Sequence, residues 1–280
     1  MSEDLLKALI LGIVQGLTEF LPVSSTAHLI LAEEVLNVDE DTYGLAFDAA
    51  LHMGTLAALL IYFGGRWLTL IAAGIASVRE RSLADPEGRL AWLIVLGTVP
   101  AAVLGFIFED AIDDTLRSPW LIATMLIAFS FVFVFAEAVG KRLRDLTDMR
   151  WADAVFVGFA QAVALVPGVS RSGATISAGL IRDLKRPEAA TFAFLLSAPI
   201  IAGAVLVQMI DVVGRFVDGT YGGEEAAFFA TGIIAAGISG YFAIAFLLRY
   251  LVSNTLRIFV IYRIALGLFV YAVLIAQAVS

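Results

Sequence analysis

Long apolar runs separated by short polar segments recur along the whole chain. A helix that crosses the hydrocarbon core of a bilayer needs about 20 predominantly apolar residues. Six stretches reach this length, namely residues 47–64, 90–108, 119–139, 190–210, 226–248 and 257–278. The segment 66–78 is shorter and amphipathic, and we expect it to lie at the membrane interface. The pattern therefore predicts an all-α polytopic membrane protein with about six transmembrane helices.

Two further apolar stretches, residues 5–31 and 152–181, are each interrupted near the middle by a proline followed by serines. The interruptions read Pro22-Val-Ser-Ser and Pro167-Gly-Val-Ser-Arg-Ser. A helix, a break and a second helix within one such stretch indicate a re-entrant helix hairpin. Irregular backbone at membrane depth is tolerated only where it lines an enclosed or water-filled cavity, so each break is a candidate site.

The two halves of the chain share a pattern. Nine residues lead from Gln15 to Ser24, and nine lead from Gln161 to Ser170. Three predicted spans follow each hairpin, and this odd number requires the second half to run in the opposite orientation. We therefore expect an inverted-topology repeat whose two hairpin tips meet near the membrane midplane. The repeats comprise residues 1–140 and 151–280 of a single integral membrane domain.

Composition favours a bilayer rather than water as the surroundings of these helices. Hydrophobic residues make up 60% of the chain and charged residues 16%, and the mean hydropathy is +0.92. The net charge of −8 argues against nucleic-acid binding, which needs a basic face. The chain has no cysteine, which excludes disulfides and thiolate chemistry, and its two histidines are too few for a histidine-rich metal site.

Lysine and arginine are concentrated in alternate loops between the predicted helices. Loops 65–89, 140–153, 181–188 and 249–257 hold 13 of them, whereas loops 1–4, 32–46, 109–118 and 211–225 hold 2. The positive-inside rule places the first group of loops in the cytoplasm and the second group, with both termini, outside.

The first hairpin brings a carboxylate, hydroxyls and an imidazole to one break. Gln15 and Glu19 are four residues apart and share a helix face. Ser24, Ser25 and Thr26 begin the second half-helix, and His28 follows on nearly the same face as Ser25. Serines also cap helices, and a lone histidine is often only a hydrogen-bonded core residue. A carboxylate at membrane depth is costly, however, so Glu19 favours a functional site.

The second hairpin has the features of a phosphate site. Its second half-helix begins with Ser170, Arg171, Ser172, Gly173, Ala174 and Thr175. Backbone N–H groups at a helix N-terminus attract phosphate, and an arginine adds a planar guanidinium that suits phosphate oxygens. We expect the hydroxyls to complete the site and Gly173 to let the backbone approach a ligand. The alternative is that Arg171 only neutralises Glu19, without any ligand.

Three other polar residues lie within predicted spans. Arg263, in the last span, is either a second phosphate contact or the partner in an ion pair. Asp48 and His52 are four residues apart near the start of the first span, where the pattern fits a structural role as well as a catalytic one. Small residues spaced by four predict close helix packing at Gly12 and Gly16 and at Gly232, Ala236 and Gly240.

The hairpin motifs resemble those of the undecaprenyl-diphosphate phosphatase family of the bacitracin-resistance type. The resemblance rests on EFLPVSSTAHL, on PGVSRSGATIS and on YRIALG around Arg263, and it covers the whole chain. It implies a multi-pass plasma-membrane enzyme that removes the terminal phosphate from a polyprenyl diphosphate. The product is the lipid monophosphate that carries glycans in cell-wall or surface-polymer assembly. The resemblance also implies an active site that faces the extracytoplasmic side.

The family's functional residues can be carried over one by one. Its paired acidic positions fall on Gln15 and Glu19, its serine and histidine fall on Ser25 and His28, and its phosphate-binding run falls on Ser170, Arg171, Ser172 and Thr175. The resemblance implies a divalent cation, Mg²⁺ or Ca²⁺, with Glu19 as the candidate ligand. Many relatives have a glutamate where this chain has Gln15, and this difference leaves fewer cation ligands.

These assignments define a predicted active site. Ser25 is the preferred nucleophile, with Glu19 and His28 as base and acid and with Arg171 as the catalytic cation. A direct attack by His28 is the alternative. The predicted substrate-binding residues are Gln15, Ser24, Thr26, Ser170, Ser172, Gly173, Thr175 and Arg263.

A different function class uses some of the same features. A transporter or flippase of an anionic substrate would also need inverted repeats and a broken-helix tip. The set of a nucleophile with acid and base groups favours the enzyme, because a carrier needs only binding groups. The predicted partners are a polyprenyl diphosphate and membrane lipids, and the sequence leaves open whether the chain forms a homodimer.

Overall fold

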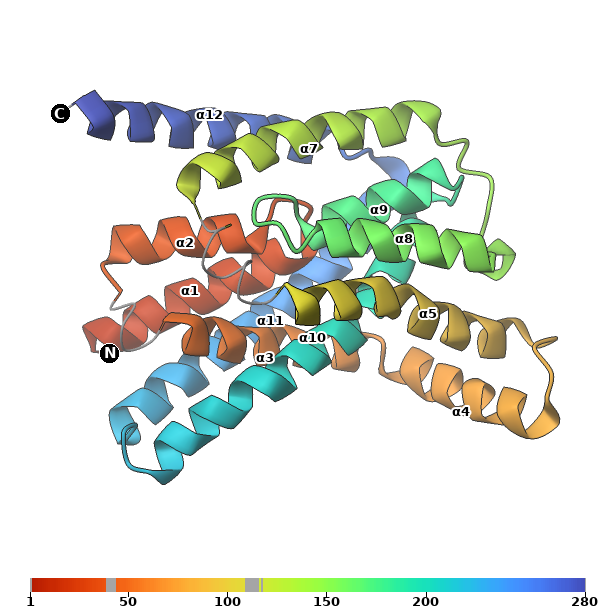
Figure 1. Cartoon of the computed structure of the whole chain (residues 1–280), viewed down its shortest axis with the longest axis horizontal. Coiled ribbons are helices and arrows are strands. Elements are labelled where there is room, and N and C mark those ends of the chain that lie inside the picture. Colours follow the sequence, from red (N-terminus) through yellow and green to blue (C-terminus); the bar gives the residue numbers. More distant parts are fainter. Residues whose placement is uncertain (1, 39–43, 109–115, 117, 280) are drawn as a thin grey trace.

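The described part of the chain is helical (Figure 1). The computed structural model describes residues 2–38, 44–108, 116 and 118–279. Its helices are α1 (Glu3–Phe20), α2 (Ser25–Leu36), α3 (Gly44–Tyr62), α4 (Gly64–Glu80), α5 (Pro86–Ile107), α7 (Pro119–Val139), the 3-10 helix η1 (Leu146–Asp148), α8 (Trp151–Val163), α9 (Arg171–Ile181), α10 (Arg186–Val217), α11 (Gly223–Ser253) and α12 (Arg257–Val279). The predicted all-α class is confirmed.

Five of the six predicted spans correspond to helices that could each cross a bilayer. Among the described residues, α5, α7, α10, α11 and α12 are each long and apolar enough to cross a bilayer. The sixth predicted span corresponds to α3, which is followed after Phe63 by α4 at an angle of 77°. Gly64 and Gly65 begin α4 directly after this bend. The pair counts as a sixth candidate span when α3 and α4 are taken as one span that is broken at the bend.

The loop predicted at residues 211–225 is much shorter in the structure. Helix α10 has 32 residues and continues to Val217, and α11 begins at Gly223. Val212 is buried against the helices around it, and Arg215 forms an ion pair with Asp211 one turn earlier. These contacts continue the helix beyond the stretch that hydropathy alone marks as a span.

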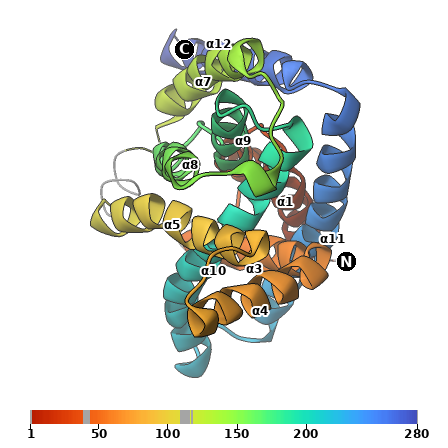
Figure 2. The same cartoon turned by 90° about the vertical axis from the view of Figure 1, so that its right-hand side faces the viewer.

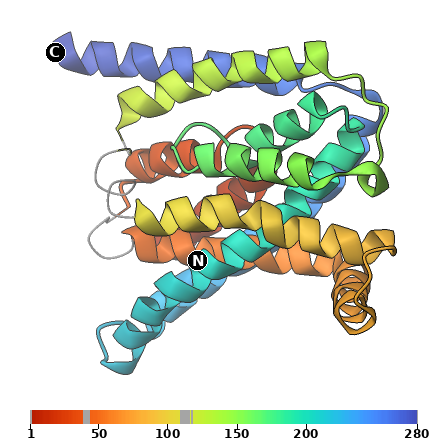
Figure 3. The same ribbon diagram turned by 45° about the vertical axis from the view of Figure 1, so that its right-hand side comes forward.

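Broken helices occupy the centre of the molecule. Viewed nearly end-on, α1 and α9 lie between α7 and α12 on one side and α3 and α10 on the other, with α11 along a third side (Figure 2). Figure 3 shows the same order and shows α4 leaving the direction of α3. Helix α1 packs mainly on α11, and α8 packs mainly on α5. The hairpin tips are therefore enclosed by protein.

The two breaks differ in length but end in the same backbone conformation. Residues 21–24 separate α1 from α2, and residues 164–170 separate α8 from α9. The last residue of each break is a serine with positive φ, with φ 77° and ψ 98° at Ser24 and φ 76° and ψ 110° at Ser170. Each predicted hairpin is thus a pair of half-helices, while the inverted orientation of the two halves stays a prediction.

Small residues let α1 and α11 pack closely, as their spacing predicts. A methyl group at Gly16 would overlap Ser239 Oγ and the carbonyl oxygen of Ala236. One at Gly12 would likewise press on the backbone of Gly232. This contact fixes the half-helix that carries the carboxylate of the first hairpin.

Candidate active site

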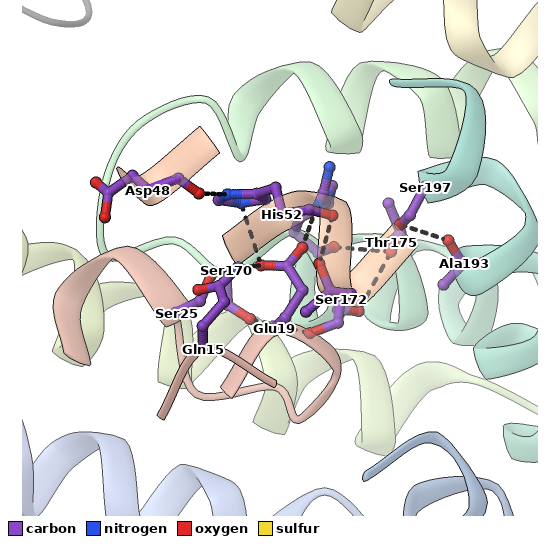
Figure 4. A network of polar contacts seen from close by, with 12 residues as sticks. Gln15, Glu19, Ser25, Asp48, His52, Ser170, Ser172, Thr175, Ala193 and Ser197 are labelled. Atoms are coloured by element: carbon purple, nitrogen blue, oxygen red, sulfur yellow. Dashed lines mark hydrogen bonds and ion pairs between the residues drawn. The ribbon is translucent and has the colours of Figure 1, made fainter. Parts of the chain in front are cut away.

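Glu19 lies where the two broken-helix tips meet, and its carboxylate is surrounded by hydrogen-bond donors (Figure 4). Its Oε2 accepts hydrogen bonds from Ser25 Oγ at 2.7 Å and from Gln15 Nε2 at 3.1 Å. Its Oε1 accepts one from Nη2 of Arg171, which comes from the second hairpin. The buried carboxylate is thus neutralised by the cation of one hairpin and bonded to the hydroxyl of the other.

The local fold explains why these side chains converge. Glu19 is in the last turn of α1, and Ser25 and Arg171 are the first residues of α2 and α9. A further hydrogen bond joins the two tips, since Ser172 Oγ donates to the carbonyl oxygen of Leu21 at 3.1 Å. The same carbonyl also accepts a hydrogen bond from the Val23 N–H at 2.7 Å, so Ser172 adds a second donor at the break.

His52, in α3, also faces Glu19 (Figure 4). Its Nε2 lies 3.6 Å from Glu19 Oε2, and its Nδ1 lies 2.7 Å from the carbonyl oxygen of Asp48. A carbonyl can only accept, so Nδ1 carries a hydrogen. Nε2 is therefore the nitrogen that can take up or release a proton beside the carboxylate. Of the two roles that the sequence left open for His52, this geometry favours the catalytic one.

A cavity of about 250 Å³ lies at the meeting point of the tips. Its polar lining consists of Glu19, Ser24, Ser25, Thr26, His52, Gln161, Ser170, Arg171 and Gln208. The rest of its wall is mostly apolar and comes from α5, α10 and the break after α8, with Ala101, Leu165 and Ile201 as examples. A lining of this kind suits a ligand with a charged end and an apolar body.

The predicted phosphate site on the second hairpin opens only partly into this cavity, where Ser170 and Arg171 line the wall. Thr175 is fully buried, and its Oγ1 donates to the carbonyl oxygen of Arg171 at 2.7 Å. Gly173 makes room for the ring of Phe133, which a Cβ would overlap, rather than for a ligand. These buried contacts hold α9 in place, so Ser170 and Arg171 are the residues positioned to touch a ligand.

His28 lies apart from the cluster. Its Nδ1 is 2.7 Å from the carbonyl oxygen of Ser24, and its Nε2 is 2.6 Å from the hydroxyl of Tyr262, whose ring stacks on the imidazole. The side chain is not part of the cavity lining. Three residues of an ideal helix turn by about 300°, so the side chains of Ser25 and His28 diverge by about 60°. Ser25 can therefore face α1 while His28 faces α12.

Arg263 is fully buried and holds the second break. Its Nη2 donates to the carbonyl oxygens of Gly168 at 2.9 Å and Met125 at 3.3 Å, and its Nε donates to Ser130 Oγ at 3.3 Å. The guanidinium carbon lies 4.8 Å from the centre of the Phe133 ring. Arg263 does not line the cavity, and these contacts give it a positioning role beneath the loop.

Two polar residues of the cavity wall, Gln161 and Gln208, were not among the predicted site residues. Gln161, near the end of α8, is 1% exposed, and neither amide atom has a hydrogen-bond partner in the described part of the chain. The sequence did contain a signal, since Gln161 matches Gln15 in its spacing from the serine of its hairpin. That spacing indicated the repeat but was not interpreted as a mark of function.

The side chains around Glu19 do not form a closed cation site. Both carboxylate oxygens accept hydrogen bonds, and Gln15 Oε1 is the neighbouring buried oxygen without a partner among the described residues. Within the described ranges, no group of three or more metal-ligating His, Asp or Glu side chains exists. Ca²⁺ takes six to eight oxygens, whereas Mg²⁺ is often held by one or two carboxylates together with substrate phosphates. The residues do not fit a cation that the protein holds alone.

Comparison with known proteins gives one consistent result. Residues 8–269 match the family described as Bacitracin resistance protein BacA. The undecaprenyl-diphosphatase of Rubrobacter xylanophilus is 47% identical over 273 residues, which cover 97% of this chain and 99% of that protein. The undecaprenyl-diphosphatases of Desulforudis audaxviator and Thermomicrobium roseum are 42% and 44% identical over 95% and 94% of this chain, and the matches cover 97% and 95% of those proteins. The chain therefore belongs to the BacA family of bacitracin resistance proteins.

Proposed function

We propose that this membrane protein hydrolyses undecaprenyl diphosphate to undecaprenyl monophosphate and inorganic phosphate. The observation that carries the proposal is the connected series of Ser25, Glu19 and Arg171, which brings a nucleophile, a proton acceptor and a phosphate-binding cation to one cavity. The relatives in Rubrobacter xylanophilus and Desulforudis audaxviator, which match nearly the whole chain, are named for this activity. The same family membership supports a role in recycling a lipid carrier.

The proposed reaction begins with attack by Ser25. Phosphoryl transfer requires an in-line nucleophile and neutralisation of the charge on the transferred group. Ser25 Oγ forms a bond to the terminal phosphorus while the bond from that phosphorus to the bridging oxygen breaks. The lipid monophosphate leaves with the electron pair, and the hydroxyl proton passes to Glu19 Oε2. Water then attacks the phosphoserine, inorganic phosphate leaves, and Ser25 Oγ regains a proton.

His52 supplies the second proton-transfer group of this proposal. The Nε2 atom of His52, 3.6 Å from the same oxygen that Ser25 contacts, can relay the proton from Glu19. We therefore assign to His52 the acid–base role that the family resemblance implied for His28.

Arg171 is proposed to bind the terminal phosphate. A guanidinium has five N–H donors, and Glu19 occupies one of them in the hydrogen bond described above. The side chain lines the cavity, so further donors can reach phosphate oxygens while the contact with Glu19 persists. The first backbone N–H groups of α9 add the partial positive charge of a helix N-terminus on the same side.

We propose that the divalent cation, Mg²⁺ or Ca²⁺, enters with the diphosphate rather than residing in the protein. The single carboxylate of the site supports this proposal, since such a site needs substrate oxygens to complete a coordination shell. Mg²⁺ alone should leave the thermal unfolding temperature of the detergent-purified protein unchanged, whereas Mg²⁺ with inorganic pyrophosphate should raise it. A rise with Mg²⁺ alone would show that the ion resides in the protein.

The proposed location is the plasma membrane, with the cavity open to the extracytoplasmic side. The distribution of lysine and arginine among the loops supports this orientation. A homodimer is a separate proposal. Light scattering, which gives the mass of the detergent-purified particle, tests it.

Hydrolysis and transport can be separated in detergent, where vectorial movement is impossible. We expect the purified wild-type chain to release inorganic phosphate from undecaprenyl diphosphate, and Ser25→Ala to release none. Wild-type protein that binds the lipid but releases no phosphate would overturn the proposed hydrolysis. That outcome would favour the transporter or flippase, whose binding groups could be the same.

A further inference from the structure

Gln161 is a polar group of the cavity wall that the proposed reaction does not use. It lies in the last turn of α8, is 1% exposed, and lines the cavity. Neither its Nε2 nor its Oε1 has a hydrogen-bond partner among the described residues. An amide buried without partners destabilises the fold unless something else completes its hydrogen bonds. Its position on the wall makes a ligand the group that can do so.

The other half of the chain shows what this position does when a partner is present. Gln15 has the same spacing to its serine, and its Nε2 donates to Glu19, four residues later on the same helix. The residue four positions after Gln161 is Leu165. The second hairpin therefore has the amide without the carboxylate that occupies it in the first. This difference leaves the Gln161 amide without the partner on its own helix that Gln15 has.

The surroundings of Gln161 indicate which part of a ligand it meets. Ser25 and Arg171 belong to the polar lining, where the reacting terminal phosphate must lie. Gln161 lines the same cavity together with apolar residues of α5, α10 and the break after α8, such as Ala101 and Leu165, and with Gln208 of α10. In a lipid diphosphate, the phosphate attached to the lipid lies between the terminal phosphate and the apolar chain. A hydrogen-bond donor in the apolar wall matches that intermediate group.

We propose that Gln161 forms a subsite for the phosphate that stays on the lipid, with its Nε2 donating to an oxygen of that group. This assignment rests on the proposed diphosphate hydrolysis. It explains how one site can select a diphosphate over a monophosphate, because a single phosphate fills only the part of the cavity at Ser25 and Arg171. It also gives the departing lipid monophosphate a hydrogen bond that favours cleavage.

Inorganic phosphate and inorganic pyrophosphate are probes that distinguish the two subsites. Phosphate needs the Arg171 end alone, whereas pyrophosphate spans both. We expect Gln161→Leu to weaken pyrophosphate binding by about ten- to hundredfold, the effect of losing one hydrogen bond to a charged group. Phosphate binding should stay within about twofold of the wild type. Isothermal titration calorimetry in detergent measures both affinities. Gln161→Glu keeps the side-chain shape and should weaken pyrophosphate binding further, because two anions would face each other.

The control variant is Val163→Leu, which changes an exposed side chain of the same helix outside the cavity lining and should bind both probes like the wild type. Helical content by circular dichroism shows whether each variant folds. Unchanged pyrophosphate binding in Gln161→Leu, or equal weakening of both probes, would overturn the assignment. A wild-type protein that shows this selectivity but does not hydrolyse undecaprenyl diphosphate would overturn the proposed function and leave the subsite standing.

Discussion

Ser24 and Ser170 have almost the same backbone conformation, with φ 77° and ψ 98° in the first and φ 76° and ψ 110° in the second. Residues with side chains rarely adopt this region, and each such residue costs on the order of 1–3 kcal/mol. Glycine would adopt it with less strain. Both serines line the cavity, so the strained positions coincide with the site. We infer that a hydroxyl is needed there more than an unstrained backbone.

We therefore expect Ser24→Gly to make the fold more stable and the enzyme less active. The Ser24 side chain caps no backbone N–H, so its removal relieves strain without breaking a cap. We expect a higher thermal unfolding temperature and a lower kcat/KM for undecaprenyl diphosphate. Ser170→Gly is the comparison, because Ser170 Oγ accepts a hydrogen bond from the Gly173 N–H. Replacing such a cap by glycine costs roughly a few tenths of a kcal/mol, which offsets part of the gain from relieved strain. An unchanged unfolding temperature in Ser24→Gly would show that the backbone is not strained.

Arg171→Lys should lose most activity although the charge is kept. A compact ammonium cannot contact Glu19 and two phosphate oxygens in the plane that the guanidinium offers. Loss of one contact to the developing charge typically costs about a hundredfold in kcat, or about 3 kcal/mol. Steady-state phosphate release measures the effect, with Arg171→Ala as the lower limit. Near wild-type turnover in Arg171→Lys would mean that the residue serves only as the counter-charge of Glu19.

The covalent intermediate should be a phosphoserine at Ser25. Acid quenching after mixing with substrate labelled on its terminal phosphate should trap a protein adduct that survives acid and is lost in alkali. The Ser25→Ala variant should yield no adduct, and Ser24→Ala should retain it, because Ser25 is the hydroxyl bonded to Glu19. An acid-labile, alkali-stable adduct in Ser25→Ala would instead identify a histidine as the nucleophile.

The two histidines should differ in their effect on turnover. His52→Ala removes the group 3.6 Å from Glu19 Oε2 and should lower kcat by about 10²–10⁴-fold, the usual range for a proton-transfer group. His28→Ala removes a contact with Tyr262 outside the cavity lining and should cost much less. Tyr262→Phe, which removes the same contact from the other side, should resemble His28→Ala. A larger loss in His28→Ala than in His52→Ala would return the acid–base role to His28.

Local patterns in the sequence were sufficient for much of this architecture. Apolar length predicted the spans, and the proline and serine runs predicted both breaks, because these features depend on residues near one another in the chain. The expectation that the two hairpin tips meet followed from the inverted repeat. The contact between Arg171 of the second hairpin and Glu19 of the first is consistent with this expectation.

Features that depend on tertiary packing could not be predicted in this way. His52 reaches Glu19 because α3 and α1 both pack on α11, where Gly54 lies against the backbone of Ile233. No spacing in the sequence encodes that approach. Arg263 looked like a ligand for phosphate, but its partners are mainly backbone carbonyls, which every sequence has. The sequence indicated what chemistry a side chain can perform, but it did not indicate which residues surround that side chain in the fold.

The orientation in the membrane can be tested with a matched pair of cysteines in a chain that has none of its own. Thr147, in η1, and Thr220, between α10 and α11, are both exposed and lie in loops assigned to opposite sides. With the lysine- and arginine-rich loops in the cytoplasm, an impermeant maleimide applied to intact cells should label Thr220→Cys and not Thr147→Cys. Both should react after the membrane is permeabilised, which controls for accessibility. Labelling of Thr147→Cys alone in intact cells would reverse the topology and turn the cavity's proposed opening toward the cytoplasm.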